Sequence, residues 1–313
     1  MPPTILLEDL AEISDQVILD NCVQDYARRD NTRWRYRDDS GREIVYPHPH
    51  DGLGEAIGKA QTFGELRAPL LRGELKYARN LQKIIAANPN IWAPKLCWGE
   101  YGRFVRHLEN VFKYIKERSS RKSGRKEADF RCLINTHKSI RGALRKKGKL
   151  PDSEGEIRRF LIENSLHRPR NCRTQKVRNP IAIEASESDA QLVSTALAYS
   201  VHSTSEQNYN PRQISIISYD LDIPNLLENF GITFNHGWMS LPTDVQELPI
   251  DWDERETITM DPELAQLQFG RPVKVYFLDL EASDIPKKQL RLTEKGEFKI
   301  RSRRHSEQLP AQA

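Results

Sequence analysis

The chain has 313 residues, a formal net charge of +4 and 38% hydrophobic residues. This length allows one large domain or two ordinary ones, with a core that needs no cross-links. The four cysteines are widely separated, which excludes a zinc site of closely spaced pairs and a disulfide framework. No apolar run approaches the roughly 18 residues that span a bilayer. We therefore expect a soluble, cytoplasmic protein that makes no use of a membrane.

The positive charge is concentrated in the middle of the chain. Residues 103–178 hold 23 Lys and Arg against 8 Asp and Glu, while the remainder is acidic. Such asymmetry indicates a polyanionic partner, and nucleic acid is favoured because no amphipathic anchor accompanies the basic residues. A solvated helical face or a flexible insertion is the alternative. The expected nucleic-acid contacts are Arg121, Lys122, Arg125, Lys126, Arg145, Lys146 and Lys147.

Short apolar runs alternate with helical patterns along the first 238 residues. The runs have the length of buried strands and lie at 17–19, 91–93, 181–183, 214–217 and 232–234. Helices are expected over 54–87, 95–118, 130–146, 154–166, 187–201 and 224–229, with a polar loop at 118–129. This alternation predicts an α/β fold in which helices cover a central parallel sheet.

The domain organisation follows from changes in composition. Residues 1–238 form the main domain, with a basic helical insertion at about 119–178. Residues 239–300 are acidic at first and then β-like, with a strand at 273–280, so we expect a small C-terminal β appendage. Residues 301–313 are polar and are expected to be a disordered tail.

Acidic residues follow the predicted strands or open the predicted helices. Asp20 ends the run 17–19, Asp220 and Asp222 follow 214–217, and Glu100 and Asp189 lie in early helical turns. Ligands of open parallel sheets bind at the carboxyl ends of the strands, where these acids could converge. Clustered carboxylates need a cation, and oxygen ligands favour Mg²⁺ or Mn²⁺. Such an ion can activate water for attack on a phosphodiester.

Each acid also has a structural interpretation. Ser186 and Asp189 fit a capping box, and Asp222 is placed to cap the helix that Pro224 opens. Glu100 alone would be a surface helix residue. Asp20 is the least easily explained in this way, because a carboxylate that ends a buried strand needs a partner or a metal.

Taken together, four short segments resemble the motifs of PIN-domain nucleases, in that family's order. They are "VILDNC" (17–22), "IWAPKLCWGEYGRF" (91–104), "ESDAQLVSTALAY" (187–199) and "ISIISYDLDIPNLL" (214–227). The resemblance implies a three-layer α/β/α fold with a central parallel sheet and a metal-dependent endoribonuclease. It assigns the metal and the catalysis to Asp20, Glu100, Asp189 and Asp220, a second acid to Asp222, and supporting roles to Ser218 and Asn21.

Two other functions remain open at this point. A PIN-like module could bind nucleic acid or protein without cutting, although the acid set is complete. A phosphatase of the haloacid dehalogenase type needs a second Asp at position 22, where this chain has Cys22. Cys22 is expected to be a small buried hydrophobic residue.

RNA is the expected partner, an inhibitory protein partner stays open, and a homodimer is the default oligomer. The aromatic residues that could stack on RNA bases, although a core role is favoured, are Phe104, Phe112, Tyr114 and Phe130.

Overall fold

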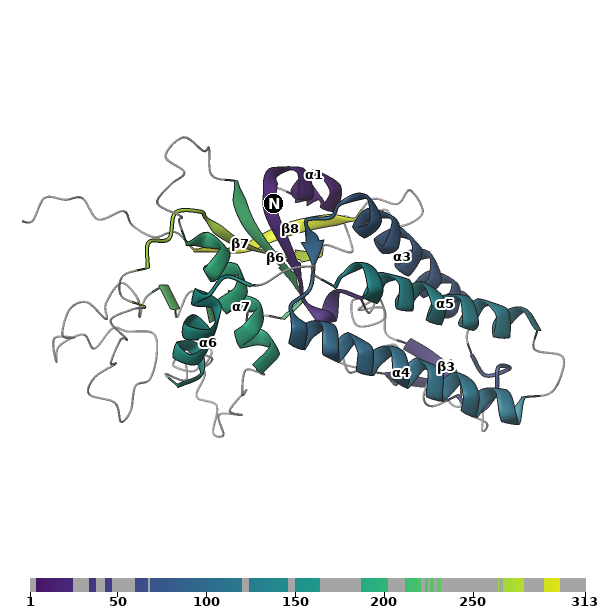
Figure 1. The fold of residues 1–313 in the computed structure, drawn as a ribbon. Helices are drawn as coiled ribbons and strands as arrows, with labels where there is room; N and C mark the ends of the chain where they lie inside the picture. The colour runs from purple at the N-terminus through teal and green to yellow at the C-terminus, as the bar shows by residue number, and fades with distance from the viewer. Residues whose placement is uncertain are drawn as a thin grey trace, which may run out of the picture.

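The structure, a computed structural model, shows an α/β protein built on one mixed sheet (Figure 1). It describes residues 4–24, 34–37, 43–46, 60–66, 68–119, 124–145, 150–163, 187–201, 212–220, 223–224, 226–227, 230–231, 264, 267–278 and 290–298. The six strands of the sheet lie in the order β1-β8-β7-β6-β2-β5. Their bounds are β1 (Thr4–Leu6), β2 (Ser14–Leu19), β5 (Ile91–Trp92), β6 (Gln213–Ser218), β7 (Val273–Leu278) and β8 (Arg291–Phe298).

The sheet is parallel on one side and antiparallel on the other. Strands β5, β2, β6 and β7 run parallel, whereas β8 pairs antiparallel with both β7 and β1. The prediction of a purely parallel sheet is therefore wrong. A strand that pairs directly with the preceding strand of the chain, as β8 does with β7, can return antiparallel without a helical crossover.

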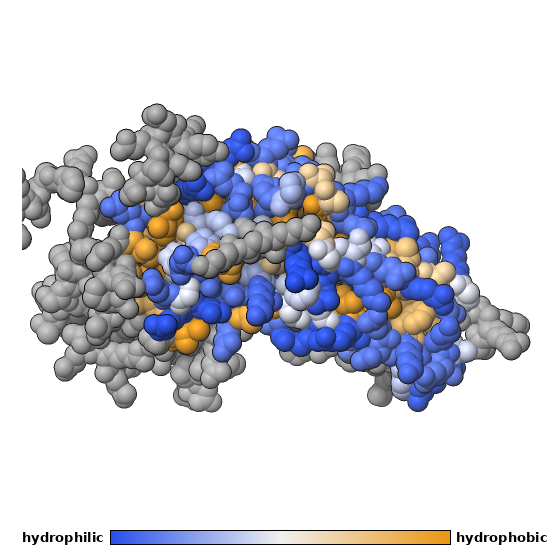
Figure 2. Space-filling view, in the orientation of Figure 1, coloured by the Kyte–Doolittle hydropathy of each residue, from blue (hydrophilic) through white to orange (hydrophobic). Residues whose placement is uncertain are grey.

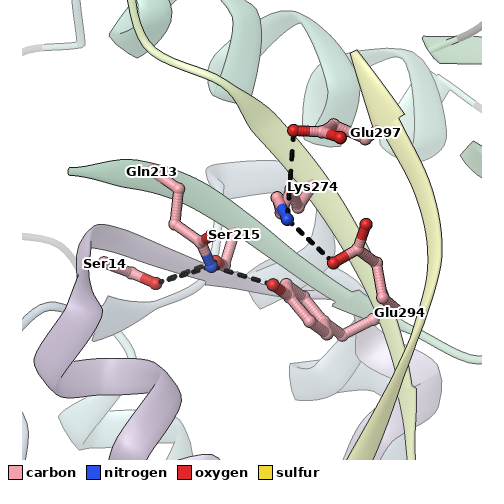
Figure 3. A network of polar contacts seen from close by, with 7 residues as sticks. Ser14, Gln213, Ser215, Lys274, Glu294 and Glu297 are labelled. Carbon is pink, nitrogen blue, oxygen red and sulfur yellow. Dashed lines mark hydrogen bonds and ion pairs between the residues drawn. The ribbon is translucent and has the colours of Figure 1, made fainter. Parts of the chain in front are cut away.

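The strand expected at 273–280 is β7, and it lies inside the main sheet. It pairs in parallel with β6 on one side and with β8 on the other, so these strands do not form a separate appendage. The one charged side chain of β7, Lys274, pairs through its ammonium group with the carboxylates of Glu294 and Glu297 on β8, at 2.9 and 3.9 Å (Figure 3). Ion pairs across neighbouring strands thus accommodate the polar residue.

The helices divide between the sheet and a helical arm (Figure 1). Helix α7 (Glu187–Ser200) packs on β2, β6 and β7, and α6 (Ser153–Glu163) packs on α7. Helices α3 (Ala68–Ala87), α4 (Lys95–Arg118) and α5 (Gly124–Ala143) extend away from the sheet as the arm. The smaller elements are α1 (Leu7–Ile13), the 3-10 turn η1 (Asn21–Gln24), and an antiparallel pair, β3 (Trp34–Arg37) with β4 (Glu43–Tyr46).

Most of the described elements agree with the sequence patterns, and two differ clearly from the expected bounds. Within the helix expected over 54–87, the described residues 61–66 form bends and turns and α3 begins at Ala68, while 54–59 lie outside the described residues. The loop expected at 118–129 is partly helical, since α5 begins at Gly124. Of the helix expected over 224–229, the described positions are helical. The strands predicted at 181–183 and 232–234 lie outside the described residues, as do 239–263 and the tail at 301–313.

Aromatic rings pack inside the arm and belong to the same apolar core as the sheet. Phe112 packs edge-on against Phe63 and Phe130, with ring centroids 5.6 and 5.4 Å apart. Closer to the sheet, the Tyr101 hydroxyl and the His137 Nδ1 atom are hydrogen bonded at 2.7 Å. The described part of the expected basic insertion, 119–178, therefore includes a helix, α5, that is built into the core of the protein.

A buried polar network closes the end of the sheet where β2, β6 and β7 begin (Figure 3). The hydroxyls of Ser14 and Ser215 are hydrogen bonded at 2.8 Å, and Gln213 Nε2 donates to Ser215 Oγ at 2.9 Å and to Tyr276 Oη at 3.0 Å. These groups satisfy one another at this end. Among the described residues, no helix combines the length and the apolar character needed to cross a membrane.

Candidate functional site

Asp20 follows β2 directly and is held against the end of β6. Its amide donates to the Ile217 carbonyl at 2.9 Å, and its side chain is only 6% exposed. Oδ2 accepts hydrogen bonds from Ser218 Oγ at 2.6 Å and from Cys22 Sγ at 2.9 Å. Within the described part of the chain, Oδ1 accepts no hydrogen bond and no cationic side chain pairs with this carboxylate. A buried charge in this situation is costly without a counter-ion.

Ser218 and Cys22 join the two strand ends. The buried Ser218 hydroxyl, besides donating to Asp20, accepts the amide of Asp220 at 3.0 Å. The Cys22 thiol accepts the amide of Tyr219 at 3.1 Å while donating to Asp20. Cys22 packs against the core as a small hydrophobic residue, as expected, but it is only half-buried and its sulfur also makes these polar contacts. Ser218 thus orients the loop that carries Asp220.

Glu100 reaches the same region from α4. The helix begins after Pro94, which has extended backbone angles, and the Gln191 side chain of α7 caps it by accepting the Leu96 amide at 2.7 Å. Glu100 Oε1 accepts the Ser188 hydroxyl of α7 at 2.8 Å. These two contacts hold the first turns of α4 and α7 side by side. Asp189 follows Ser188 in the first turn of α7.

The buried thiol of Cys97 lies among three of the acids. Burial raises the pKa of this thiol well above its ordinary value, and the negative charges of Asp20, Glu100 and Asp189 raise the pKa further. Cys97 Sγ also donates to the Ser188 carbonyl at 3.7 Å. Carboxylates from three separate segments therefore act on one sulfur atom, which means that the fold brings them to one region.

The donor atoms suit a hard divalent cation. Among the described residues, no group of three or more His, Cys, Asp or Glu side chains lies close enough together to hold a metal ion as arranged. Asp20 nevertheless accepts hydrogen bonds on Oδ2 alone among the described residues, which leaves Oδ1 available, and carboxylate oxygens are the ligands that Mg²⁺ and Mn²⁺ prefer. The side chains that could hold such an ion are Asp20, Glu100, Asp189 and Asp220. Asp222 lies outside the described residues, and Asn21 opens η1 in a half-buried position.

The basic residues expected to contact nucleic acid have mixed environments. Arg121, Lys122, Lys146 and Lys147 lie outside the described residues. Arg125 and Arg145 are exposed, as a phosphate contact requires. Lys126, however, donates to the Gly64 carbonyl at 2.8 Å, so it ties α5 to the turns at 60–66. Its ammonium group already has a structural contact.

The aromatic residues are mostly core, as favoured from the sequence. Phe130 is buried, and Phe104 and Phe112 pack against the core from half-buried positions. Tyr114 is the exception, since its side chain is 42% exposed on α4. Of the four aromatic residues, Tyr114 is the one open to a nucleic-acid base.

Sequence reasoning missed three residues that shape the site. They are Ser188, Gln191 and Cys97, which respectively bind Glu100, cap α4 and lie among the carboxylates. A signal existed for two of them. Ser188 and Gln191 are polar residues in a helix that is otherwise rich in Ala, Leu and Val, and such residues need partners when buried.

Comparison of the chain with protein-family models, curated proteins and solved structures gives no match. The resemblance to PIN-domain nucleases rests on the four motifs themselves.

Proposed function

We propose that this protein is a metal-dependent endoribonuclease that hydrolyses RNA phosphodiester bonds with Mg²⁺ or Mn²⁺ bound by Asp20, Glu100, Asp189 and Asp220. The observation that carries the proposal is the environment of Asp20. Its buried carboxylate has hydrogen bonds on one oxygen only and no cationic partner among the described residues, while the charges of two further acids reach the neighbouring Cys97. A divalent cation would compensate this concentration of negative charge.

The residues of the chain divide the work in the proposed reaction. The four carboxylates would hold the ion, which on binding lowers the pKa of a coordinated water and neutralises charge on the leaving oxygen. Ser218 is a positioning residue, because its hydroxyl fixes both the Asp20 carboxylate and the Asp220 amide. Ser188 plays the same part for Glu100. Asp222 and Asn21 are supporting residues in this proposal.

The test is cleavage of single-stranded and hairpin RNA by purified protein, with Mn²⁺ and with excess chelator. We expect cleavage only with the metal, and a loss of at least about 100-fold for Asp20→Asn and Glu100→Gln, as for removal of a group that stabilises transition-state charge. Glu12→Gln is the matched control, because Glu12 is exposed at the other end of β2. Its rate should equal that of the parent.

Two results would contradict the proposal. If the parent binds RNA but cleaves none under any metal condition, the chain is a binding module. If Asp20→Asn cleaves as fast as the parent while remaining folded, the assigned carboxylate does not hold the catalytic ion.

A further inference from the structure

The exposed face of α4 carries a line of cations that starts beside the candidate metal ligand Glu100. Arg103, Arg106, Lys113 and Arg118 are all exposed, and they recur at intervals that keep them on one broad side of the helix. Together with the exposed Tyr114 they form what we call the α4 stripe. At about 1.5 Å per residue, the stripe extends about 22 Å from Arg103 to Arg118.

The stripe is continuous with the carboxylates. Arg103 Nη2 lies 3.3 Å from Glu100 Oε1, and the same oxygen accepts the Ser188 hydroxyl of α7. Helix α4, and the stripe with it, runs along the arm away from the sheet (Figure 1), and the face of the arm drawn in Figure 2 is largely hydrophilic. One surface therefore leads from the candidate centre toward the far end of α4.

Two cations of the stripe, Arg106 and Lys113, differ from the ion-paired cations of the neighbouring helix α5. The described Arg131 and Lys138 on α5 are ion paired with Glu127 and Glu109 respectively. In contrast, Arg106 and Lys113 form no ion pair with any described residue. Their charge is therefore the more available for an external anion.

The stripe ends in an aromatic platform. The Arg118 guanidinium carbon lies 3.6 Å from the centroid of the Tyr114 ring, and Arg118 Nη1 donates to the Tyr114 carbonyl at 3.4 Å. An exposed tyrosine with a guanidinium on its face offers stacking surface to an unpaired base. The helix beneath is rigidly held, because the Ser119 hydroxyl accepts the Phe63 amide at 2.8 Å and Phe112 packs inside the arm.

We propose that the α4 stripe binds single-stranded RNA and leads it to the carboxylates, with Arg106 and Lys113 on the phosphates and a base stacked at Tyr114. The direction toward the carboxylates rests on the proposed nuclease function. The binding itself does not, so the two are tested separately. A single strand is the occupant because only unstacked bases can reach an aromatic side chain, and because Asp20 is nearly buried.

Binding is measured by fluorescence anisotropy with a labelled oligouridylate, in chelator so that no cleavage occurs. Arg106→Gln/Lys113→Gln removes two phosphate contacts without disturbing the Arg103 to Glu100 pair. Each contact on a single strand contributes about 0.7 to the slope of log affinity against log salt, so we expect the slope to fall by about 1.4. At 0.1 M salt, the loss of this electrostatic contribution corresponds to roughly 25-fold weaker binding of the oligouridylate.

Arg131→Gln/Lys138→Gln is the matched control, since it makes the same charge change on exposed positions of the next helix. It should change the affinity by less than about threefold, because exposed ion pairs contribute little and the charges are already neutralised locally. Equal losses in the two double variants would overturn the proposal, since the effect would then be one of net charge alone.

The tyrosine has its own test. Tyr114→Ala should weaken oligouridylate binding by roughly 5- to 100-fold, and Tyr114→Phe should restore it, because stacking needs only the ring. An abasic sugar–phosphate oligomer should bind the three proteins equally. If Tyr114→Ala also weakens binding of the abasic oligomer, the residue acts through the helix and not through a base.

Competition identifies the occupant. The proposal would be contradicted if duplex RNA of equal length competed as well as the single strand. It would also be contradicted if poly-glutamate did so, because the occupant would then be an acidic polypeptide. If Mn²⁺ produces no cleavage but RNA binding still depends on the stripe residues, the proposed nuclease function is refuted and the proposed binding by the α4 stripe stands. If no stripe variant changes either cleavage or binding, the proposed binding by the α4 stripe is refuted and the proposed nuclease function stands.

Discussion

The hydroxyl of Ser218, which bonds a carboxylate, should contribute more to stability than the hydroxyl of Ser215, the other serine of β6, which bonds only neutral groups. Ser218→Ala removes a hydrogen bond to the buried Asp20 carboxylate and leaves the Asp220 amide without its acceptor. A hydrogen bond to a charged group is worth about 1.5–3 kcal/mol and an unsatisfied amide costs about 1 kcal/mol or more. We therefore expect the free energy of unfolding to fall by about 3 kcal/mol.

Ser215 provides the matched control on β6. Its side chain is as buried as that of Ser218, but its partners are the neutral Ser14 hydroxyl and the Gln213 amide. Ser215→Ala should cost only about 1 kcal/mol, the usual net value of a neutral hydrogen bond. Urea unfolding followed by circular dichroism measures both variants. Equal losses, or a larger loss for Ser215→Ala, would refute the view that Asp20 is a charged group held by Ser218.

Three further predictions follow from single positions. Gly102→Ala should be about 0.5–1 kcal/mol less stable than Gly99→Ala, because a Cβ at Gly102 would lie 2.8 Å from Arg141 Nε and displace the guanidinium that stacks on the Trp98 ring at 3.7 Å. At Gly99 nothing lies within 4 Å of such a Cβ. Thermal unfolding of the two variants decides this, and equal stability would contradict it. The raised pKa of Cys97 predicts stability that is complete below the unfolded thiol pKa of about 8.5 and declines as the pH rises beyond it. Cys97→Ala should lose part of that decline, and an unchanged pH profile would show that the thiol is not buried among the acids. In the parent, saturating Mn²⁺ at about 100 times its dissociation constant should add about 2.7 kcal/mol of stability, an increase that Asp20→Asn should lack.

The sequence predicted the individual helices and strands more accurately than the pairing of the sheet. The bounds of α4 are those expected, because Pro94 and a long amphipathic pattern mark the helix locally. The strands at 17–19, 91–93 and 214–217 correspond to β2, β5 and β6, each a short apolar run. Parallel pairing then puts the ends of β2 and β6 at one edge, which is why Asp20 and Ser218 could be placed together.

The errors have a common physical origin in long-range pairing. The place of β7 and β8 in the sheet depends on the pairing of β7 with β6 and of β8 with β1, which are both distant in the sequence, and the pattern of β7 is the same in an appendage and in the sheet. The start of α5 was missed because its first residues are polar and lie on the solvent side. Cys97 was missed because no local pattern shows that carboxylates from three segments surround it.

The most direct test of the account is calorimetric titration of the chelator-treated protein with Mn²⁺. We expect the parent and Glu12→Gln to bind the ion with the same affinity, because Glu12 is exposed and is not a candidate ligand. Asp20 is the most buried of the candidate ligands, so its variant is the decisive one. Asp20→Asn should bind it at least about 10-fold more weakly, as expected when a charged ligand becomes neutral. Equal Mn²⁺ affinity in all three proteins, or none in the parent, would contradict the assignment of Asp20 to a metal centre.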